Sequence, residues 1–492
     1  MEFNSFKNLI IIVPEIFLGT STIALIIYGS SIINNQKKNF PLIINAISKL
    51  CILTLTFTIF LIYDNNLTYD TFLYSKTFIK DDLGTIVSIV LLCAAILCFL
   101  ITESYLNHQK LPAFEYVIIL LLAIEGLLLL CSSFDLISIY LAIELQSLSF
   151  YVLAGYKKNS TFSTESGLKY FILGSFSSGF LLFGFSIIYG LTGMTCFEDI
   201  SLYFFTIDKT DNFIDIALIF VLVALFFKLS VAPFHLWSPD IYEGAPSIST
   251  VFFAVLPKIS LLVLLVRLFY FSFFKITPLY FEIFSSIAIL SVLIGTLGAL
   301  KQRKVKSLIA YSSISHVGYL LVAFSTLCFE GIQVLFFYIL IYMLTSVCVW
   351  AIFMAVNLKK YYLIKTSKHL SDFTSLSILN PVLALILSLT FLSLAGIPPL
   401  IGFYAKAIVF LCAVEASLFL TTFIILLISV ISAFYYLRII KTVYFENTTN
   451  LKLYCNIEYI QSFIISLISL NFVFLFLNPN LLSLICYKIS VL

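Results

Sequence analysis

The sequence has few charged residues for its length. Asp, Glu, Lys and Arg make up 11% of its 492 residues, whereas soluble domains carry roughly 25%. Hydrophobic residues make up 61%. A chain with so little charge cannot cover the surface of a water-soluble fold of this size, so we exclude a soluble domain. The formal net charge of +3 is too small to indicate a nucleic-acid partner.

The sequence also lacks the usual motifs of cofactor-binding proteins. It has no cysteine cluster for iron and sulfur, no glycine-rich nucleotide loop and no histidine pair at haem spacing. Of the ten cysteines, Cys93, Cys98, Cys131, Cys348 and Cys412 fall within or at the edges of apolar runs, without paired ligand spacing. We interpret these five as packing residues, and we expect no redox cofactor or metal within this chain.

Long apolar runs are what the sequence does have. Each lasts about 20 residues or more, enough for a helix to cross a hydrocarbon core roughly 30 Å thick, and none has the alternation of a barrel strand. The first run is too long for a signal-peptide core, so we expect it to be retained. The sequence therefore predicts an all-α polytopic membrane bundle of about 14 transmembrane helices. The expected spans are 9–33, 42–63, 84–105, 112–131, 134–156, 164–192, 213–240, 247–272, 279–300, 305–326, 330–357, 376–414, 417–437 and 458–477.

Lysine and arginine are distributed unevenly between the two sets of connections. The loops that join an odd-numbered span to the next even-numbered one hold 16 of them, and the opposite side, with both termini, holds 6. By the positive-inside rule the first set faces the cytoplasm or matrix, so both termini face outward. The first set is Lys37, Lys38, Lys110, Lys157, Lys158, Lys301, Arg303, Lys304, Lys306, Lys359, Lys360, Lys365, Lys368, Arg438, Lys441 and Lys452, and the second is Lys7, Lys76, Lys80, Lys209, Lys275 and Lys488.

Two spans contain proline near their middle after the same short pattern. KLSVAPFHLW (228–237) in the seventh span and LSLAGIPPLIGF (392–403) in the twelfth both have Leu-Ser-x-Ala before proline. We expect both helices to be interrupted near the bilayer midplane, because proline removes a backbone donor. The two spans lie five helices apart, which predicts two inverted five-helix repeats. The expected division is an N-terminal three-helix segment over 1–111, repeats over 112–275 and 276–445, and a C-terminal span over 446–492.

Four ionisable residues fall near the middles of spans: Glu144, Lys228, Lys258 and Lys406. Charges inside a membrane are costly and usually functional, although static ion pairs and lysines that reach the interface are the alternatives. Desolvation lowers the pKa of a buried lysine and a carboxylate raises it, so a lysine with a carboxylate nearby can hold and release a proton. We therefore predict a proton relay in which Glu144 modulates Lys228, Lys258 passes the proton on and Lys406 is the terminal group.

Two histidines are further candidates for this relay. His235 lies seven residues after Lys228, and His316 lies within the tenth span. A lone buried histidine is also a common packing residue, so both interpretations stay open. Glu125 is another central carboxylate, which we expect to form hydrogen bonds in its neutral form because its own span has no basic residue nearby.

Five stretches of the sequence resemble a known family. They span nearly the whole chain and are similar to subunit 2 of respiratory complex I, called subunit N in bacteria, a member of the antiporter-like subunits. The stretches are YLAIELQSLSFYVLAGYKK, STESGLKYFILGSFSSGFLLFG, FKLSVAPFHLWSPDIYEGAP, KVKSLIAYSSISHVGY and AGIPPLIGFYAK.

This resemblance implies a 14-helix bundle with inverted repeats, and proton translocation driven by quinone reduction elsewhere in the complex. It matches the family's central glutamate and lysine to Glu144 and Lys228, its bridging lysine to Lys258 and its terminal lysine to Lys406. A paralogous subunit resembles sequences with glutamate at the last position, so Lys406 favours subunit 2. Glu125 matches no position of the family pattern.

The resemblance also implies where the rest of the chemistry lies. NADH, FMN, iron–sulfur clusters and ubiquinone are expected in other parts of the complex. The expected partners are the other membrane subunits, including neighbouring antiporter-like subunits, together with membrane lipids. Animal mitochondrial versions lack the first three helices, which this chain keeps, so the expected location is the inner membrane of a plant, algal or protist mitochondrion, with a bacterial inner membrane as the alternative.

Two other functions remain open at this point. The chain could be a subunit of a multisubunit cation/proton antiporter, which shares the bundle and the charges, and sodium-coupled transport insensitive to NADH would indicate it. It could also be a structural membrane subunit with static ion pairs. Normal proton pumping by an assembled Lys228→Ala complex would favour that interpretation.

Overall fold

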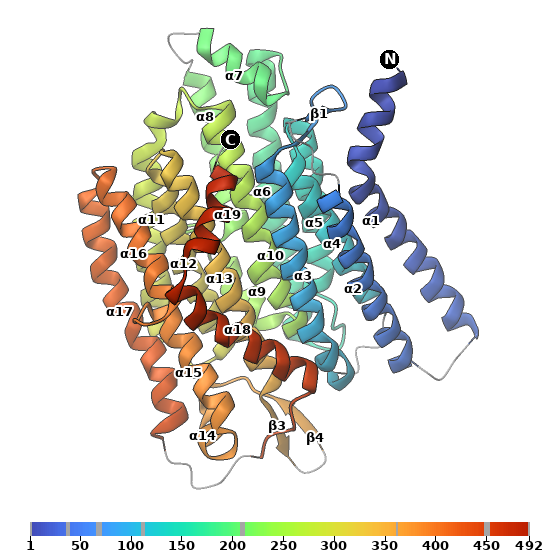
Figure 1. Cartoon of the computed structure of the whole chain (residues 1–492), viewed down its shortest axis with the longest axis vertical. Helices are drawn as coiled ribbons and strands as arrows, with labels where there is room; N and C mark the ends of the chain where they lie inside the picture. The colour runs from blue at the N-terminus through green and yellow to red at the C-terminus, as the bar shows by residue number, and fades with distance from the viewer. Residues whose placement is uncertain are drawn as a thin grey trace.

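The computed structural model describes residues 2–35, 40–64, 71–109, 114–206, 212–360, 363–446 and 453–490. Within these ranges, 13 helices are long and apolar enough to cross a membrane. Two further helices of 15 residues each, α15 (Pro381–Ala395) and α16 (Ile401–Glu415), follow one another through the bundle (Figure 1). The chain is therefore a multi-pass membrane protein, and the predicted fold class is confirmed.

The elements follow one another through short connections. The N-terminal elements are α1 (Glu2–Asn35), α2 (Phe40–Asp64), the antiparallel hairpin β1 (Thr71–Leu73) and β2 (Phe78–Lys80), and α3 (Asp82–Gln109). The next set is α4 (Glu115–Ser132), α5 (Leu136–Ala154), α6 (Thr161–Thr192), α7 (Phe197–Thr206), α8 (Asn212–Leu229), α9 (Trp237–Gly244), α10 (Ser247–Val266) and the π-helical turn η1 (Arg267–Ser272). The second half contains α11 (Thr277–Leu300), α12 (Val305–Ser325), α13 (Phe329–Ala355), the antiparallel hairpin β3 (Asn357–Lys360) and β4 (Leu363–Thr366), the 3₁₀ turn η2 (Leu370–Phe373) and α14 (Leu376–Leu379). After α15 and α16, the chain ends with α17 (Phe419–Tyr444), α18 (Tyr459–Leu477) and α19 (Asn480–Ser490).

The connections gather at the two ends of the bundle. Figure 1 places β1 and α7 at the end where the N-terminus lies, and β3, β4 and α14 at the opposite end. The α11–α12 connection belongs to this second end, since Lys304 forms a β-bridge with His369. Five of the basic residues in the predicted charge bias lie outside the described residues: Lys37, Lys38, Lys110, Lys209 and Lys452.

The orientation in the membrane is a prediction that labelling can test. With Gln302→Cys, in the α11–α12 connection, we expect a membrane-impermeant thiol reagent to react only from the cytoplasmic or matrix side. The native Cys328 provides the control, because it is exposed and immediately precedes α13 at the other end of the bundle. Reaction of the new cysteine from the outer side would reverse the orientation.

The first predicted interruption is present between α8 and α9. α8 ends at Leu229, and Ser230 adopts a positive φ of 60°. The indole Nε1 of Trp237 donates to the carbonyl of Phe227 at 2.8 Å. Backbone groups freed by a break inside a membrane need such a partner, because water is scarce there. Pro257, by contrast, lies inside α10 without ending that helix.

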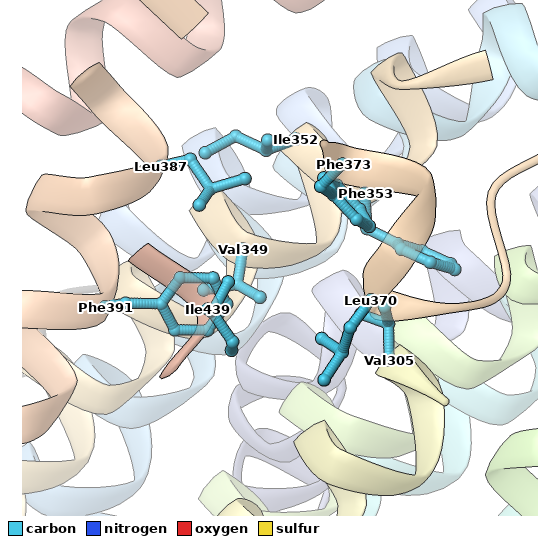
Figure 2. A pocket seen from close by; sticks show the side chains of 9 residues that line it. All are labelled: Val305, Val349, Ile352, Phe353, Leu370, Phe373, Leu387, Phe391 and Ile439. Atoms are coloured by element: carbon cyan, nitrogen blue, oxygen red, sulfur yellow. The ribbon is translucent and has the colours of Figure 1, made fainter. Parts of the chain in front are cut away.

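Apolar packing holds η2 against the end of the bundle where β3 and β4 lie. Figure 2 shows Leu370 and Phe373 of η2 facing side chains of other helices across a cavity of about 10 Å³. This space is about one water molecule in size and offers no polar partner, so we interpret it as a packing gap rather than a ligand site. The lining residues are Val305, Val349, Ile352, Phe353, Leu370, Phe373, Leu387, Phe391 and Ile439.

We propose that α4–α10 and α11–α17 are the two inverted repeats, close to the expected ranges 112–275 and 276–445. The broken crossing is the fourth of each set, α8–α9 in the first and α15–α16 in the second. The segment α1–α3 precedes the first repeat and α18 follows the second. The short helix α19 after α18 was not expected from hydropathy.

Candidate functional site

Lys228 occupies the membrane-embedded end of α8, immediately before the break. Its ammonium donates to the hydroxyl of Tyr151 on α5 at 3.1 Å. The same nitrogen lies 5.6 Å from the centroid of the Tyr151 ring. A phenol oxygen and a ring face therefore hold this cation, where simple charge pairing would place a carboxylate.

Glu144, Ser147 and Tyr151 lie on one face of α5, because spacings of three and seven residues match the helical period. Ser147 Oγ lies 3.4 Å from a carboxylate oxygen of Glu144 and next to the Tyr151 hydroxyl. The other carboxylate oxygen is buried and has no hydrogen-bond partner among the described residues. A polar row thus connects Glu144 with Lys228, and no direct ion pair joins these two residues in the described part of the chain.

Lys258 lies in the centre of the fully buried helix α10 and is itself 3% exposed. Its ammonium donates to the hydroxyl of Tyr342 on α13 at 3.0 Å and lies 4.9 Å from the centroid of that ring. None of the ion pairs in the described ranges includes Lys258. Its proton is therefore held by a neutral group rather than a carboxylate.

His316 on α12 is surrounded by tyrosines. Its Nδ1 lies 2.7 Å from the hydroxyl of Tyr338, and its Nε2 lies 3.1 Å from the hydroxyl of Tyr436. The imidazole ring is 5.3 Å from the ring of Tyr342, which binds Lys258. A neutral imidazole can donate from one nitrogen and accept at the other, so His316 can pass a proton between its two neighbours.

Lys406 on α16 reaches back to the second break. Its ammonium donates to the carbonyls of Leu394 and Ala395, both at 2.9 Å, at the end of α15. Gly396 follows with a φ of +82°, and a Cβ there would lie 2.9 Å from Cδ of Lys406. Glycine therefore allows both the turn and the close approach of the lysine. The predicted interruption near the proline pair is confirmed, and the freed carbonyls have a side-chain partner.

A small cavity lies between His316 and Lys406. Its volume is about 10 Å³, which is enough for about one water molecule where polar partners are present. Tyr338, Tyr342 and Ser393 also line it. One water molecule here would connect the ammonium to the hydroxyl of Tyr338, which is bonded to the imidazole Nδ1.

Each half of the site has a tyrosine beneath a lysine, on helices that the proposed repeats would superimpose. Tyr319 on α12, whose ring lies 5.2 Å from the Lys406 ammonium, takes the place that Tyr151 has on α5. Aligning these two tyrosines puts Ser147 opposite Ser315 and Glu144 opposite Ser312. The second half thus keeps the tyrosine and the serine but has a serine where the first half has its carboxylate.

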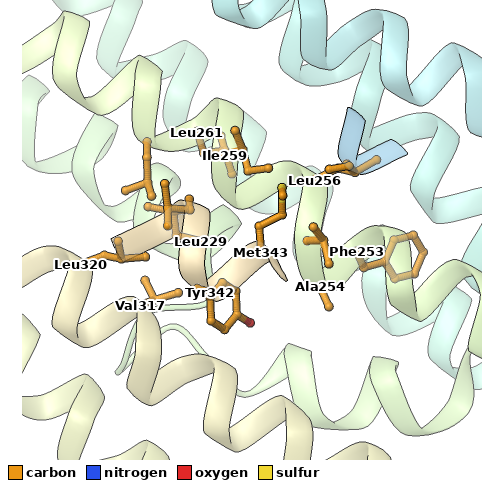
Figure 3. Packing of buried hydrophobic residues seen from close by; sticks show 14 of the residues in the cluster. Leu229, Phe253, Ala254, Leu256, Ile259, Leu261, Val317, Leu320, Tyr342 and Met343 are labelled. Carbon is orange, nitrogen blue, oxygen red and sulfur yellow. The ribbon is translucent and has the colours of Figure 1, made fainter. Parts of the chain in front are cut away.

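An apolar region separates the two parts of the site. Leu229 follows Lys228, Ile259 follows Lys258, and both belong to one buried cluster with Val317 and Leu320 of α12 (Figure 3). No hydrogen bond or ion pair connects Lys228 with Lys258 across the described residues. The sequence predicts one row of four residues. The structure instead arranges them as two groups: Glu144 with Lys228, and Lys258 with His316 and Lys406.

The other two polar candidates lie apart from these groups. His235, in the break, is 7% exposed, and its Nδ1 has no hydrogen-bond partner within the described ranges. Its ring lies near that of Tyr311 of α12, with ring centroids 6.5 Å apart. Glu125 faces α1, where a Cβ at Gly19 would come within 2.7 Å of its carboxylate. Its contact is thus with the N-terminal segment.

Sequence reasoning missed the tyrosines and one buried arginine. Tyr151, Tyr342 and Tyr319 could be found only through their spacing from the charges, since the chain has 28 tyrosines. Arg267 in η1 is 2% exposed, and it donates to Asp81 at 2.7 Å. This buried ion pair connects the start of α3 with the end of the α10 crossing.

The comparisons with known proteins show the family of the chain. The family model described as NADH:quinone oxidoreductase/Mrp antiporter matches residues 133–432. The chain is 40% identical to NADH-ubiquinone oxidoreductase chain 2 of Marchantia polymorpha over 97% of each chain. It is 37% identical to subunit N of the NADH-quinone oxidoreductase of Pelagibacter ubique, covering 89% of this chain and 90% of that relative.

A solved structure shows the same fold. One chain of respiratory complex I from Thermus thermophilus, determined with bound Aureothin, matches with a TM-score of 0.79 and 26% identity, over 96% of this chain and 98% of that one. The broken helices and buried lysines thus define an antiporter-like membrane subunit. The chain belongs to the NADH:quinone oxidoreductase/Mrp antiporter family, and within it to the group of chain 2 and subunit N.

Proposed function

We propose that this chain translocates protons through Glu144, Lys228, Lys258, His316 and Lys406, as a membrane subunit of respiratory complex I. The observation that carries this proposal is the bonding of the three lysines. Each ammonium rests on a tyrosine ring, and none has a carboxylate within ion-pair distance in the described residues. A static structural role would pair a buried charge with a counter-ion, because an unpaired one is strongly destabilising.

The first segment runs from Glu144 to Lys228. Glu144 is the carboxylic acid at the start of this row. The hydroxyls of Ser147 and Tyr151 can both donate and accept hydrogen bonds, so a proton can be transferred from one to the next. When Glu144 is ionised, its charge favours the ammonium form of Lys228. When Glu144 becomes protonated, that support is lost and desolvation favours release of the lysine proton.

The second segment runs from Lys258 to Lys406. The contacts follow in the order Lys258, Tyr342, His316, then the small cavity and Lys406. Since Glu144 has no counterpart in this half, the carbonyls of Leu394 and Ala395 stabilise the Lys406 ammonium instead. Carbonyl dipoles hold a cation less strongly than a carboxylate does, which suits a terminal group that must release its proton.

The two segments exchange protons only when the apolar region between them admits water. Leu229 follows Lys228 in the sequence, Ile259 follows Lys258, and both belong to the same buried cluster. We infer that movement at the α8–α9 break, directly beside Leu229, hydrates this region during turnover. His235 is buried in the same break, and its Nδ1 has no hydrogen-bond partner in the described part of the chain, so it is a candidate for an additional proton-binding group beside the relay.

The chain itself carries out no redox chemistry in this proposal. Among the described residues no group of three or more His, Cys, Asp or Glu could hold a metal ion. NADH, FMN, iron–sulfur clusters and ubiquinone would bind other subunits, and neighbouring membrane subunits would be the partners. The relatives in Marchantia polymorpha and Pelagibacter ubique fit a mitochondrial inner membrane, or a bacterial inner membrane.

The Tyr151 hydroxyl provides an early test of the first segment. Tyr151→Phe removes the oxygen between Ser147 and Lys228 but keeps the ring under the ammonium, so we expect an assembled complex whose pumping rate falls about tenfold. The measurement is acidification in sealed vesicles driven by NADH. Tyr189→Phe is the matched control, because Tyr189 is 55% exposed on α6. Equal rates in the two variants would remove Tyr151 from the relay.

Ion dependence distinguishes this function from a cation/proton antiporter, which the same family model covers. Transport by membranes containing this chain should require NADH and a quinone and should proceed without sodium. Sodium-coupled transport that continues without NADH would identify the antiporter instead.

A further inference from the structure

The hydroxyl of Tyr319 on α12 is buried and has no hydrogen-bond partner in the described part of the chain. The side chain is 1% exposed. A buried hydroxyl without a hydrogen bond costs free energy, because it has lost its contacts with water. The ammonium of Lys406 lies 5.2 Å from the centroid of the same ring. A strong hydrogen-bond donor therefore lies close to this hydroxyl without bonding to it.

The other two lysines of the relay do bond to the tyrosine beneath them. Lys228 donates to the hydroxyl of Tyr151 at 3.1 Å, with 5.6 Å between its ammonium and the ring centroid. Lys258 donates to the hydroxyl of Tyr342 at 3.0 Å, with 4.9 Å to the ring centroid. The corresponding centroid distance at the third lysine, 5.2 Å, falls between these two values. The third ammonium is thus as close to its tyrosine ring as the other two are, but it bonds elsewhere.

Lys406 instead donates to the carbonyls of Leu394 and Ala395 at the second break, both at 2.9 Å. An ammonium group has three hydrogens, so two carbonyls leave one of them without an acceptor. Gly396 gives this side chain room, since a Cβ there would lie 2.9 Å from Cδ and 3.4 Å from Nζ of Lys406. The four-carbon stem of lysine is flexible. Lys406 therefore has both an unused donor and a side chain that can change its direction.

We propose that Lys406 has two binding positions, one on the carbonyls of Leu394 and Ala395 and one on the hydroxyl of Tyr319. The two positions differ in chemistry. Carbonyl oxygens only accept hydrogen bonds, so a lysine bound to them can only donate. A phenol hydroxyl both accepts and donates. At Tyr319 the hydroxyl can accept from the ammonium form of the lysine, and it can donate to the lone pair of the neutral amine.

The two positions would let the lysine take up a proton at one place and release it at another. On the carbonyls, Lys406 adjoins the small cavity that Tyr338 and His316 also line. Tyr319 lies about one turn further along α12 than His316, away from the α11–α12 connection. The predicted orientation puts that connection on the cytoplasmic or matrix side, so movement to Tyr319 would take the proton outward. This role rests on the relay proposed above, whereas the two positions follow from the contacts alone.

The position of Lys406 can be measured in density maps of the intact complex, recorded at rest and during NADH turnover. We expect two classes of particles, with the ammonium on the carbonyls in one and at hydrogen-bond distance from the Tyr319 hydroxyl in the other. In Tyr319→Phe, which keeps the ring, only the carbonyl class should remain. A lysine that stays on the carbonyls in every class of the unmodified complex would overturn the proposal. So would movement to Ser393 Oγ, which is also buried without a partner among the described residues and lines the cavity.

Pumping by Tyr319→Phe tests the role of the second position. Removing an unpartnered buried hydroxyl should leave assembly normal and the melting temperature equal or higher. Acidification in sealed vesicles driven by NADH should nevertheless fall about tenfold. Tyr116→Phe is the matched control and should pump normally, because its hydroxyl is also buried without a partner in the described ranges while its ring packs on Tyr156.

A Lys406→Met complex separates failure of this inference from failure of the relay. If Lys406→Met loses pumping while Tyr319→Phe pumps like the control, the second position has no role and the relay stands. If Lys406→Met also pumps normally, the relay itself is wrong at its terminal group. Should Tyr319→Phe fail to assemble, the hydroxyl is needed for the fold, and only a class with Lys406 bound to Tyr319 in the unmodified complex would support the proposal.

Discussion

A Lys228→Arg complex should assemble normally and lose most of its proton pumping, at least about tenfold. Arginine keeps the positive charge, so it preserves any interaction that needs only a cation, but it does not release its proton in a protein. In the relay Lys228 must lose and regain a proton in every cycle, and the arginine blocks that step. Because pumping and electron transfer are coupled, turnover of NADH should fall as well.

The experiment has a matched control within the chain. Lys169 on α6 forms ion pairs with Glu165 and Asp240, at 2.8 and 3.1 Å, and is 45% exposed. Lys169→Arg should therefore assemble and pump at the normal rate. Both variants are compared by the pH gradient that sealed vesicles form with NADH. A normal gradient from assembled Lys228→Arg would remove this lysine from the relay and favour a static role.

A Lys258→Met complex should lose proton pumping while keeping its thermal stability. Methionine has nearly the shape of lysine but no charge, and Lys258 has no carboxylate partner within the described residues. Removing an unpaired buried charge should leave the thermal stability of the complex equal or higher. Pumping should nevertheless fall at least about tenfold, since no other titratable side chain begins the second segment.

Two further variants test the same proton-transfer step, one as a second probe and one as a control. Tyr342→Phe keeps the ring under the Lys258 ammonium and removes only the hydroxyl that accepts its hydrogen bond, so it should reduce pumping without unfolding the complex. Lys301→Met changes an exposed lysine at the end of α11 and should have no effect. If Lys258→Met lowers the melting temperature as much as it lowers pumping, the lysine is needed for the fold, and its place in the relay is lost.

Much of the fold could be predicted because a membrane imposes a simple rule on sequence. Each crossing needs an apolar run of sufficient length, so hydropathy located every long helix. The breaks could be predicted as well, because Pro233 and the pair Pro398 and Pro399 stand where a continuous helix would need a donor. The short helix α19 was missed because 11 residues are too few to give a membrane signal.

Only the charged residues of the site could be predicted from the sequence. Glu144, Lys228, Lys258 and Lys406 stand out because charges are rare in apolar runs. Tyr151 and Tyr342 do not stand out, because aromatic residues make up 16% of the chain and most of them pack in the core. Their role depends on contacts between α8 and α5, and between α10 and α13, which hydropathy cannot locate. The same limit hid the apolar region that separates Lys228 from Lys258.

The most direct test of the account is a high-resolution density map of the intact complex, recorded during NADH turnover. In at least one state, we expect ordered water between Lys228 and Lys258, within the buried apolar cluster that includes Leu229 and Ile259, and one water molecule in the cavity between His316 and Lys406. Ordered water would then bridge the gap between the two segments and the gap before Lys406. A map in which this apolar region stays dry and closed in every state, while pumping proceeds at the normal rate, would contradict the relay.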